Sequence, residues 1–96
     1  MLEIRPNCEL CDIDLPADSL EAFICSYECT FCRSCVDTIL HNICPNCGGG
    51  FSPRPVRPKK EFRKGVSLLH QPASVKRKHS KYSKEQIEQF IKKISE

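Results

Sequence analysis

The chain has 96 residues, 28% of them charged, and a formal net charge of +3, which suits a single small domain. No apolar run is long enough to cross a bilayer, and Glu3, Arg5 and Pro6 stand where a secretory signal would need apolar residues. We therefore expect a cytoplasmic protein without a membrane partner. In that reducing compartment, clustered cysteines bind metal far more often than they form disulfides.

Charge divides the chain into parts of opposite sign. Residues 1–50 hold eight acidic side chains against two arginines, about −6, and residues 51–84 hold eleven lysines and arginines against one acid, about +10. All eight cysteines lie in the first part. We expect three segments: a metal-binding head (residues 1–52), a basic, proline-containing extended arm or linker (residues 53–82), and a C-terminal amphipathic helix (residues 83–96).

The cysteines of the head form four close pairs. A head of this size needs a metal or a cross-link for stability, because it cannot bury enough apolar surface by itself. The pairs are Cys8-x2-Cys11, Cys25-x3-Cys29, Cys32-x2-Cys35 and Cys44-x2-Cys47. Each pair can present two sulfurs to one ion, and two pairs complete a closed four-sulfur shell typical of structural zinc. The sequence therefore predicts two Zn²⁺ ions. Each site ends at about −2, because four thiols lose their protons to one divalent ion.

The spacing alone leaves the pairing of these pairs open. A nested arrangement would crowd four ligands from Cys25 to Cys35 into one short turn, whereas sequential and crossed arrangements both remain open. An iron–sulfur cluster is a weaker alternative, because Ile39 occupies the position where that pattern needs its fourth ligand. His41 is interpreted as a solvent-facing residue rather than a ligand.

Residues 8–47 resemble a RING-type zinc finger. Phe31 directly before the fifth ligand, Val36 after the sixth and Pro45 inside the last pair match that family, and Cys29 replaces its usual histidine. The resemblance implies a crossed arrangement with two zinc sites, one formed by Cys8, Cys11, Cys32 and Cys35, and the other by Cys25, Cys29, Cys44 and Cys47. The whole chain is also similar to a family of small bacterial proteins of unknown function that share its opening residues.

Local patterns agree with a hairpin followed by a helix. Residues 21–25 are expected to form a strand that pairs with residues 30–31. Ser34 is expected to cap a helix that Asn42 and Pro45 end. Four apolar residues of this segment have helical spacing and are expected to form its buried face, namely Val36, Ile39, Leu40 and Ile43. The predicted fold is a small metal-stabilised α+β domain, a RING-like ββα cross-brace followed by a basic arm and a helix.

The arm combines four prolines with many cations, a composition that favours disorder or loose tethering. Phosphate binding is one interpretation, and a solubilising tail or an arm that lies against its own acidic head are the others. The candidate nucleic-acid contacts are Arg54, Arg57, Lys59, Lys60, Arg63, Lys64, Lys76, Arg77 and Lys78.

A helix is predicted over residues 83–96. Ser83 and Gln86 have the spacing of a capping box, and an apolar stripe follows, formed by Ile87, Phe90, Ile91 and Ile94. A helix this short is marginal alone, so we expect it to dock on the head, a second copy or a partner, in a monomer or weak dimer.

No arrangement typical of a catalytic site stands out, and a closed four-sulfur shell does no Lewis-acid chemistry. We therefore expect a non-catalytic zinc-binding module that binds a protein as an adaptor or regulator. Nucleic-acid binding through residues 54–81 is one alternative. A ubiquitin-ligase-like adaptor is another; the RING resemblance then implies contacts by Leu10, Ile39 or Leu40, and Pro45 with a conjugating enzyme. Against it, the helix lacks an aromatic residue and Gly48 follows the last cysteine.

Overall fold

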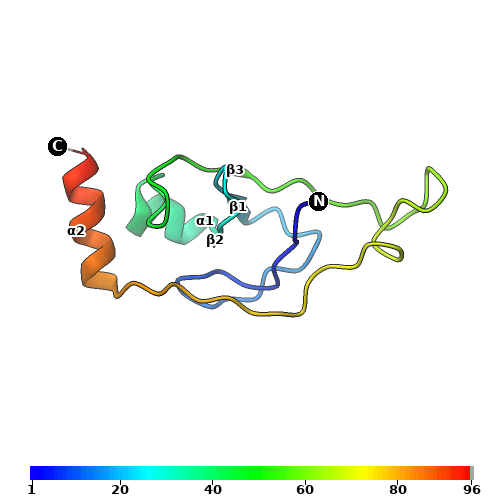
Figure 1. The fold of residues 1–96 in the computed structure, drawn as a ribbon, viewed down its shortest axis with the longest axis horizontal. Helices are drawn as coiled ribbons and strands as arrows, with labels where there is room; N and C mark the ends of the chain where they lie inside the picture. The colour runs from blue at the N-terminus through cyan, green and yellow to red at the C-terminus, as the bar shows by residue number, and fades with distance from the viewer. Residues whose placement is uncertain (96) are drawn as a thin grey trace.

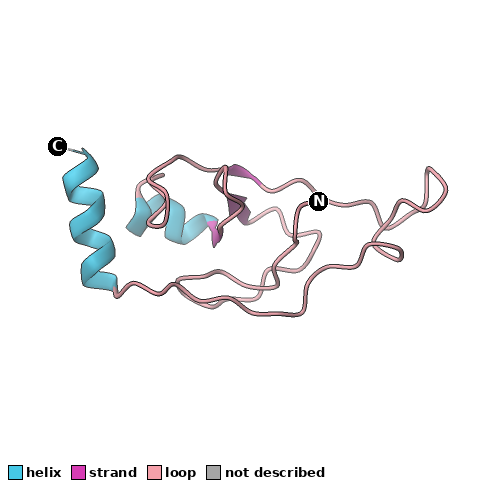
Figure 2. Cartoon of the chain, in the orientation of Figure 1, coloured by secondary structure: helices cyan, strands magenta, loops and turns pink. Residues whose placement is uncertain are grey.

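A computed structural model describes residues 1–95 as an elongated molecule measuring 49 × 20 × 19 Å, with helix α2 at one end and a projecting loop at the other (Figure 1). Most of the chain has no regular secondary structure (Figure 2). The elements in order are β1 (Ala22–Ile24), β2 (Thr30–Cys32), α1 (Arg33–Cys35), the π-helical turn η1 (Val36–Leu40), β3 (Ser52–Pro53) and α2 (Lys84–Ser95). None of the helices in residues 1–95 is long and apolar enough to traverse a bilayer.

The predicted hairpin is confirmed as an antiparallel pair of β1 and β2, with Phe23 opposite Phe31. The turn between them is closed by Cys25 N–H, which donates to Cys29 O at 3.2 Å. Strand β3 was not expected; it pairs with the other edge of β1, so the sheet order is β2-β1-β3. Pro53 is compatible with this short edge strand because it needs no ladder donor there.

The helix after β2 begins earlier than predicted, and the expected cap at Ser34 is wrong. Cys32 is the N-cap, with extended backbone and a sulfur that accepts from Cys35 N–H at 3.4 Å. Ser34 already lies inside the first turn, where its carbonyl accepts from Thr38 Oγ1 at 2.7 Å. The segment widens into η1 and ends at His41, whose left-handed backbone (φ 49°) stops it one residue before the expected Asn42.

The core lies between the sheet, η1 and the cysteine loops. Phe31 and Leu40 are fully buried, and the Phe31 ring meets Phe51 edge-on with centroids 5.4 Å apart. On the predicted apolar face of the helix, Val36 is also buried, whereas Ile39 and the next apolar residue, Ile43, pack partly buried against the same cluster. The predicted helical face is therefore confirmed for Val36, Ile39 and Leu40, whereas Ile43 lies beyond the end of η1.

The capping box of α2 is confirmed by two hydrogen bonds. Ser83 N–H donates to Gln86 Oε1 at 2.8 Å, and Gln86 N–H donates to Ser83 Oγ at 3.1 Å. Ile87 and Ile91 are buried against the head, where α2 packs on η1. Of the three expected docking sites for α2, the structure shows the one on the head of the same chain. Glu96, the last residue of the expected helix, lies outside the described residues.

The arm lies against its own head, which is one of the interpretations that its composition left open. It leaves the sheet after β3, forms a projecting loop at residues 58–71, here called the distal loop, and returns along the N-terminal residues (Figure 1). The returning segment is held by backbone hydrogen bonds from Ser74 N–H to Ile4 O at 2.9 Å and from Ser80 N–H to Glu9 O at 2.7 Å. Composition allowed this path but did not predict the groups that hold it, because the partners are backbone groups far away in sequence.

Candidate metal centres

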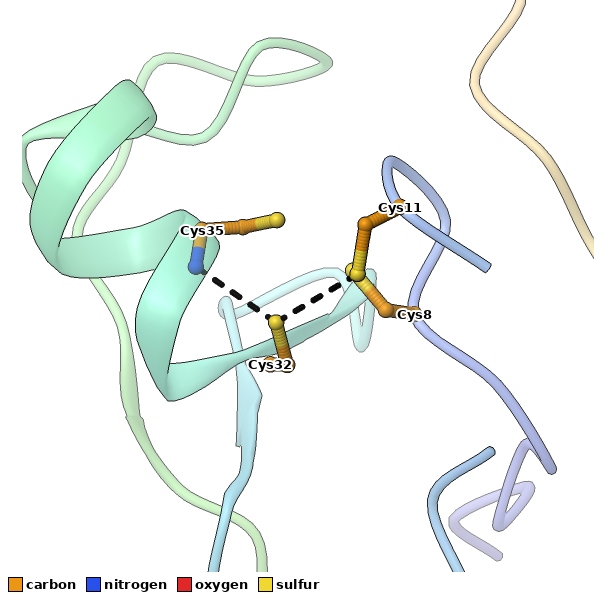
Figure 3. A group of neighbouring side chains, drawn as sticks. All are labelled: Cys8, Cys11, Cys32 and Cys35. Atoms are coloured by element: carbon orange, nitrogen blue, oxygen red, sulfur yellow. Dashed lines mark hydrogen bonds between the residues drawn. The ribbon is translucent and has the colours of Figure 1, made fainter. Parts of the chain in front are cut away.

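Four cysteines gather at the first centre, Cys8, Cys11, Cys32 and Cys35, and their sulfurs all lie within 4.8 Å of one another (Figure 3). The sulfurs of Cys11 and Cys32 are 3.6 Å apart. A zinc ion with bonds of about 2.3 Å in tetrahedral geometry requires sulfurs about 3.8 Å apart. The donor set and its spacing therefore fit one zinc ion.

Three elements deliver these ligands. Cys32 ends β2 and Cys35 lies in α1, whereas Cys8 and Cys11 come from a turn that Asp12 N–H closes by donating to Cys8 O at 3.0 Å. Leu10 N–H donates to Cys8 Sγ at 3.4 Å, as Cys35 N–H does to Cys32 Sγ. Backbone N–H groups aimed at sulfur stabilise thiolates, which is the form that binds metal.

The second centre is formed by Cys25, Cys44 and Cys47, whose sulfurs also lie within 4.8 Å of one another. Cys29 is buried beside Cys25 but falls outside this mutual spacing. Gly49 N–H donates to Cys47 Sγ at 3.4 Å. The structure thus gathers seven of the eight predicted ligands into two groups and places the eighth adjacent to one of them.

Gly48 is needed in the turn of the second centre. Its φ of +80° is disfavoured for residues with a side chain, and a Cβ atom there would lie 3.4 Å from Ile94 Cδ1 of α2. Its N–H donates to Cys44 O at 2.7 Å. The glycine after the last cysteine therefore lets the ligand turn close while α2 packs beside it.

Burial, neighbouring sulfurs and hydrogen bonds shift the pKa values of the thiols in different directions. Burial raises the pKa of Cys35, and neighbouring Cys8 and Cys32 raise it further. Burial raises the pKa of Cys44 in the second centre in the same way. Burial also opposes ionisation of Cys11, but hydrogen bonds, beginning with the Ile13 backbone, outweigh it and lower the pKa. One thiolate is favoured while its neighbours resist ionisation, and a divalent cation removes this conflict.

Glu9, between the first two ligands, connects the two centres. It is only 2% exposed, and its carboxylate accepts from Thr30 N–H at 2.8 Å and from Asn46 Nδ2 at 3.4 Å. Asn46 lies between Cys44 and Cys47 of the second centre. The sequence indicated Glu9 only as one of the eight acidic side chains of the head; its place inside a cysteine pair was the available signal.

Three arm cations that we considered as phosphate ligands bind the protein itself. Arg54 is 4% exposed and donates to Arg5 O and Pro16 O, both at 2.9 Å. Burial lowers the pKa of this guanidinium. Arg57 donates to Leu2 O and to Gln71 O. Arg77 binds the acidic turn of the first centre, where its partners are Asp12 and Asp14.

Residues 1–57 match the family described as "Protein of unknown function (DUF1272)". The chain belongs to this family. The DUF1272 region contains all eight cysteines and every element except α2, so the family match and the two cysteine clusters coincide. The distal loop, the returning segment and α2 lie beyond it.

A curated relative, "Uncharacterized protein R02474" of Rhizobium meliloti (strain 1021), is 58% identical over 64 residues, which are 67% of this chain and 76% of the relative. The expected similarity to small bacterial proteins of unknown function is confirmed by this relative and by the DUF1272 match. No solved structure matches the chain.

Proposed function

We propose that the protein is a non-catalytic module in which two structural zinc ions hold a RING-like cross-brace, and that it binds another protein as an adaptor or regulator. The observation that carries this proposal is the four-sulfur shell of the first centre. When bound there, zinc has no open position for water or substrate, so it supplies folding energy rather than catalysis.

The crossed order of ligands is supported by which pairs meet. The pair Cys8–Cys11 gathers with Cys32–Cys35 and passes over the pair that lies between them in sequence. A sequential arrangement would instead join the first two pairs. Cys29 completes the second centre in this proposal, since it lies buried beside Cys25 and no other cysteine of the chain is left.

A protein partner is favoured by the groove between η1 and α2. This groove, about 450 Å³, has apolar Ile39 and Ile91 on its walls and charged side chains along its rim, which are Lys84, Glu88 and Lys92. An apolar centre with a polar rim is the usual composition of a protein interface. Ile39 is partly buried, so its outer side is available for contact.

Metal analysis and partner capture test this proposal together. Two zinc ions per chain are expected in wild type, in Ile39→Glu and in the control Leu20→Glu, which alters a 76% exposed residue away from the groove. Cross-linking in extract of the native cells should capture a protein with wild type and the control but not with Ile39→Glu. A metal-free folded chain, or equal capture by all three, would contradict the proposal.

Nucleic-acid binding remains the second candidate because the distal loop presents exposed cations, namely Lys60, Arg63 and Lys64. Arg54, Arg57 and Arg77 are engaged in the fold, and Lys59 pairs with Asp18. The other exposed cations of the candidate set are these three together with Lys76 and Lys78. Affinity for an oligonucleotide should fall as salt rises, and replacing these five cations by glutamine should abolish it. Binding that is unchanged by the replacement would eliminate this candidate.

The ligase-like alternative meets an obstacle in the position of α2. Leu40 is fully buried, Pro45 is buried, and a pocket of about 270 Å³ beside Pro45 is lined on its other side by α2 residues, including Ile87 and Phe90. The helix therefore covers the Pro45 side of the surface that this role needs, whereas Ile39 lines the neighbouring groove. Background rates of conjugating-enzyme discharge are expected, and stimulated discharge would revive the alternative.

A further inference from the structure

The returning arm crosses the loop that carries two ligands of the first metal centre. Residues 74–80, here called the strap, run beside residues 4–14 (Figure 1). The backbone bonds from Ser74 to Ile4 and from Ser80 to Glu9 fix the two ends of this contact. The strap lies beyond the residues that match the family. It therefore adds support that the family-matched region alone does not contain.

Asn7, directly before the first ligand, binds the strap as a neighbouring strand would. Its side chain is fully buried; its amide nitrogen donates to Lys78 O at 2.8 Å and its amide oxygen accepts from Lys78 N–H at 3.1 Å. The same nitrogen also lies 3.1 Å from Cys8 O. A buried amide without such partners destabilises a fold, so the position of Cys8 is linked to the presence of the strap.

Arg77, at the centre of the strap, holds the turn of the second ligand, Cys11. Its guanidinium donates to Asp12 O at 2.6 Å, to Asp12 Oδ1 at 2.8 Å and to Asp14 Oδ1 at 2.6 Å. Asp12 follows Cys11 with a left-handed backbone (φ 64°), a conformation that needs support from its surroundings.

We propose that the strap is an outer support of the first metal centre, with Arg77 as the positioning residue that slows release of the ion held by Cys8, Cys11, Cys32 and Cys35. This inference rests on the proposed zinc sites. Cys11 is the exposed ligand of its group, so its loss from the ion is the natural first step of release. Arg77 opposes that step by fixing the Cys8–Asp12 turn through its hydrogen bonds to Asp12.

Release of zinc from the full chain to excess chromogenic chelator tests the proposal. In Arg77→Ala, one of the two zinc ions should leave about 10-fold faster, the lower end of the effect of outer-shell partners, while the other keeps its rate. Arg77→Lys should restore part of the difference. Lys76→Ala, in the same strap and exposed, is the matched control and should release both ions at the wild-type rate.

Cadmium-113 NMR of the cadmium-loaded chain identifies the affected centre. Arg77→Ala should shift only the signal that disappears in Cys11→Ser, which removes one ligand of the first centre. Because the Arg77 pairs are exposed, salt should narrow the difference in release rate between wild type and Arg77→Ala. Should Arg77→Ala not fold, Asp14→Asn removes one of the same ion pairs and should accelerate the same phase by a smaller factor.

Three results would overturn the proposal. Equal rates for wild type and Arg77→Ala, with two zinc ions bound in each, would refute the strap and leave the proposed zinc module intact. Equal acceleration of both ions would indicate general destabilisation. A wild-type chain that binds no zinc would refute both proposals together.

Discussion

The head and the arm are both ordered, but by different means. Six of the thirteen residues in the buried cluster are cysteines of the head, so nearly half of this interior consists of cysteine side chains. Between residues 53 and 82 only Arg54 and Ser67 are buried, and the arm is held by hydrogen bonds to the head. The order of the arm therefore depends on hydrogen bonds to the head, whereas the head contains cysteine clusters that could bind metal.

Metal removal should have the largest effect, because it should abolish the order of both the head and the arm. A strong chelator should unfold the head, release the arm and melt α2, because structural zinc contributes on the order of 10 kcal/mol per site to small folds of this kind. Far-UV circular dichroism and the dispersion of the amide NMR spectrum measure the loss, and added zinc should restore both. A dispersed spectrum from chain proven to be metal-free would contradict the expectation.

A pair of phenylalanine substitutions compares the two regions directly. Phe31→Ala removes a fully buried ring of the head and should lower the free energy of unfolding by about 3–5 kcal/mol. Phe62→Ala changes a 73% exposed ring of the arm and should alter it by less than about 0.5 kcal/mol. Denaturant unfolding at fixed free zinc measures both, and similar losses would disprove the assignment of the core.

Weakening the packing of α2 on η1 should have a smaller effect, which changes the stability of the helix but leaves the head folded. Ile87→Ala empties a side-chain site that is 1% exposed, at a cost of about 2–5 kcal/mol to the packing of α2 on η1. Hydrogen exchange of α2 amides should accelerate, while the chain still binds two zinc ions. Ile94→Ala, at a 43% exposed position of the same helix, is the control and should change the exchange little.

The smallest predicted effect concerns helix caps. Ser83→Ala removes half of the capping box and should destabilise α2 by about 1 kcal/mol. Ser34→Ala should have almost no effect, because Cys32 caps the first helix and the Ser34 hydroxyl is not needed there. Hydrogen exchange at the first turn of each helix distinguishes them. A larger effect at Ser34 would restore the cap that the sequence pattern predicted.

The sequence predicted those elements that are encoded by neighbouring residues. The hairpin depends on residues 21–32, and the α2 cap on Ser83 and Gln86, so spacing alone revealed them. The groups of sulfurs also follow the cysteine pairs, although Cys29 stands apart from the other three of its predicted centre.

The path of the arm could not be predicted in this way. It depends on contacts such as Arg77 with Asp12, 65 residues apart, and on the backbone of Lys78 with the Asn7 amide. The opposite net charges of the head and the arm were visible in the sequence. They do not predict which residues of the two segments pair, because charge attraction is not specific to particular atoms. The cap at Cys32 was missed for another reason: a sulfur counted as a metal ligand also accepts a backbone hydrogen bond.

The distal loop is closed at its base, because Leu68 N–H donates to Pro58 O at 2.9 Å. The Arg57 guanidinium also donates hydrogen bonds to Gln71 O and to Leu2 O. At Gly65, whose φ is +78°, an added Cβ atom would lie more than 4 Å from any atom outside its chain neighbours. A reporter domain or fluorescent label inserted there would be attached to a loop whose base is closed by hydrogen bonds, and it should not distort either cysteine cluster. The protein thus offers an internal tagging position that leaves both chain ends free.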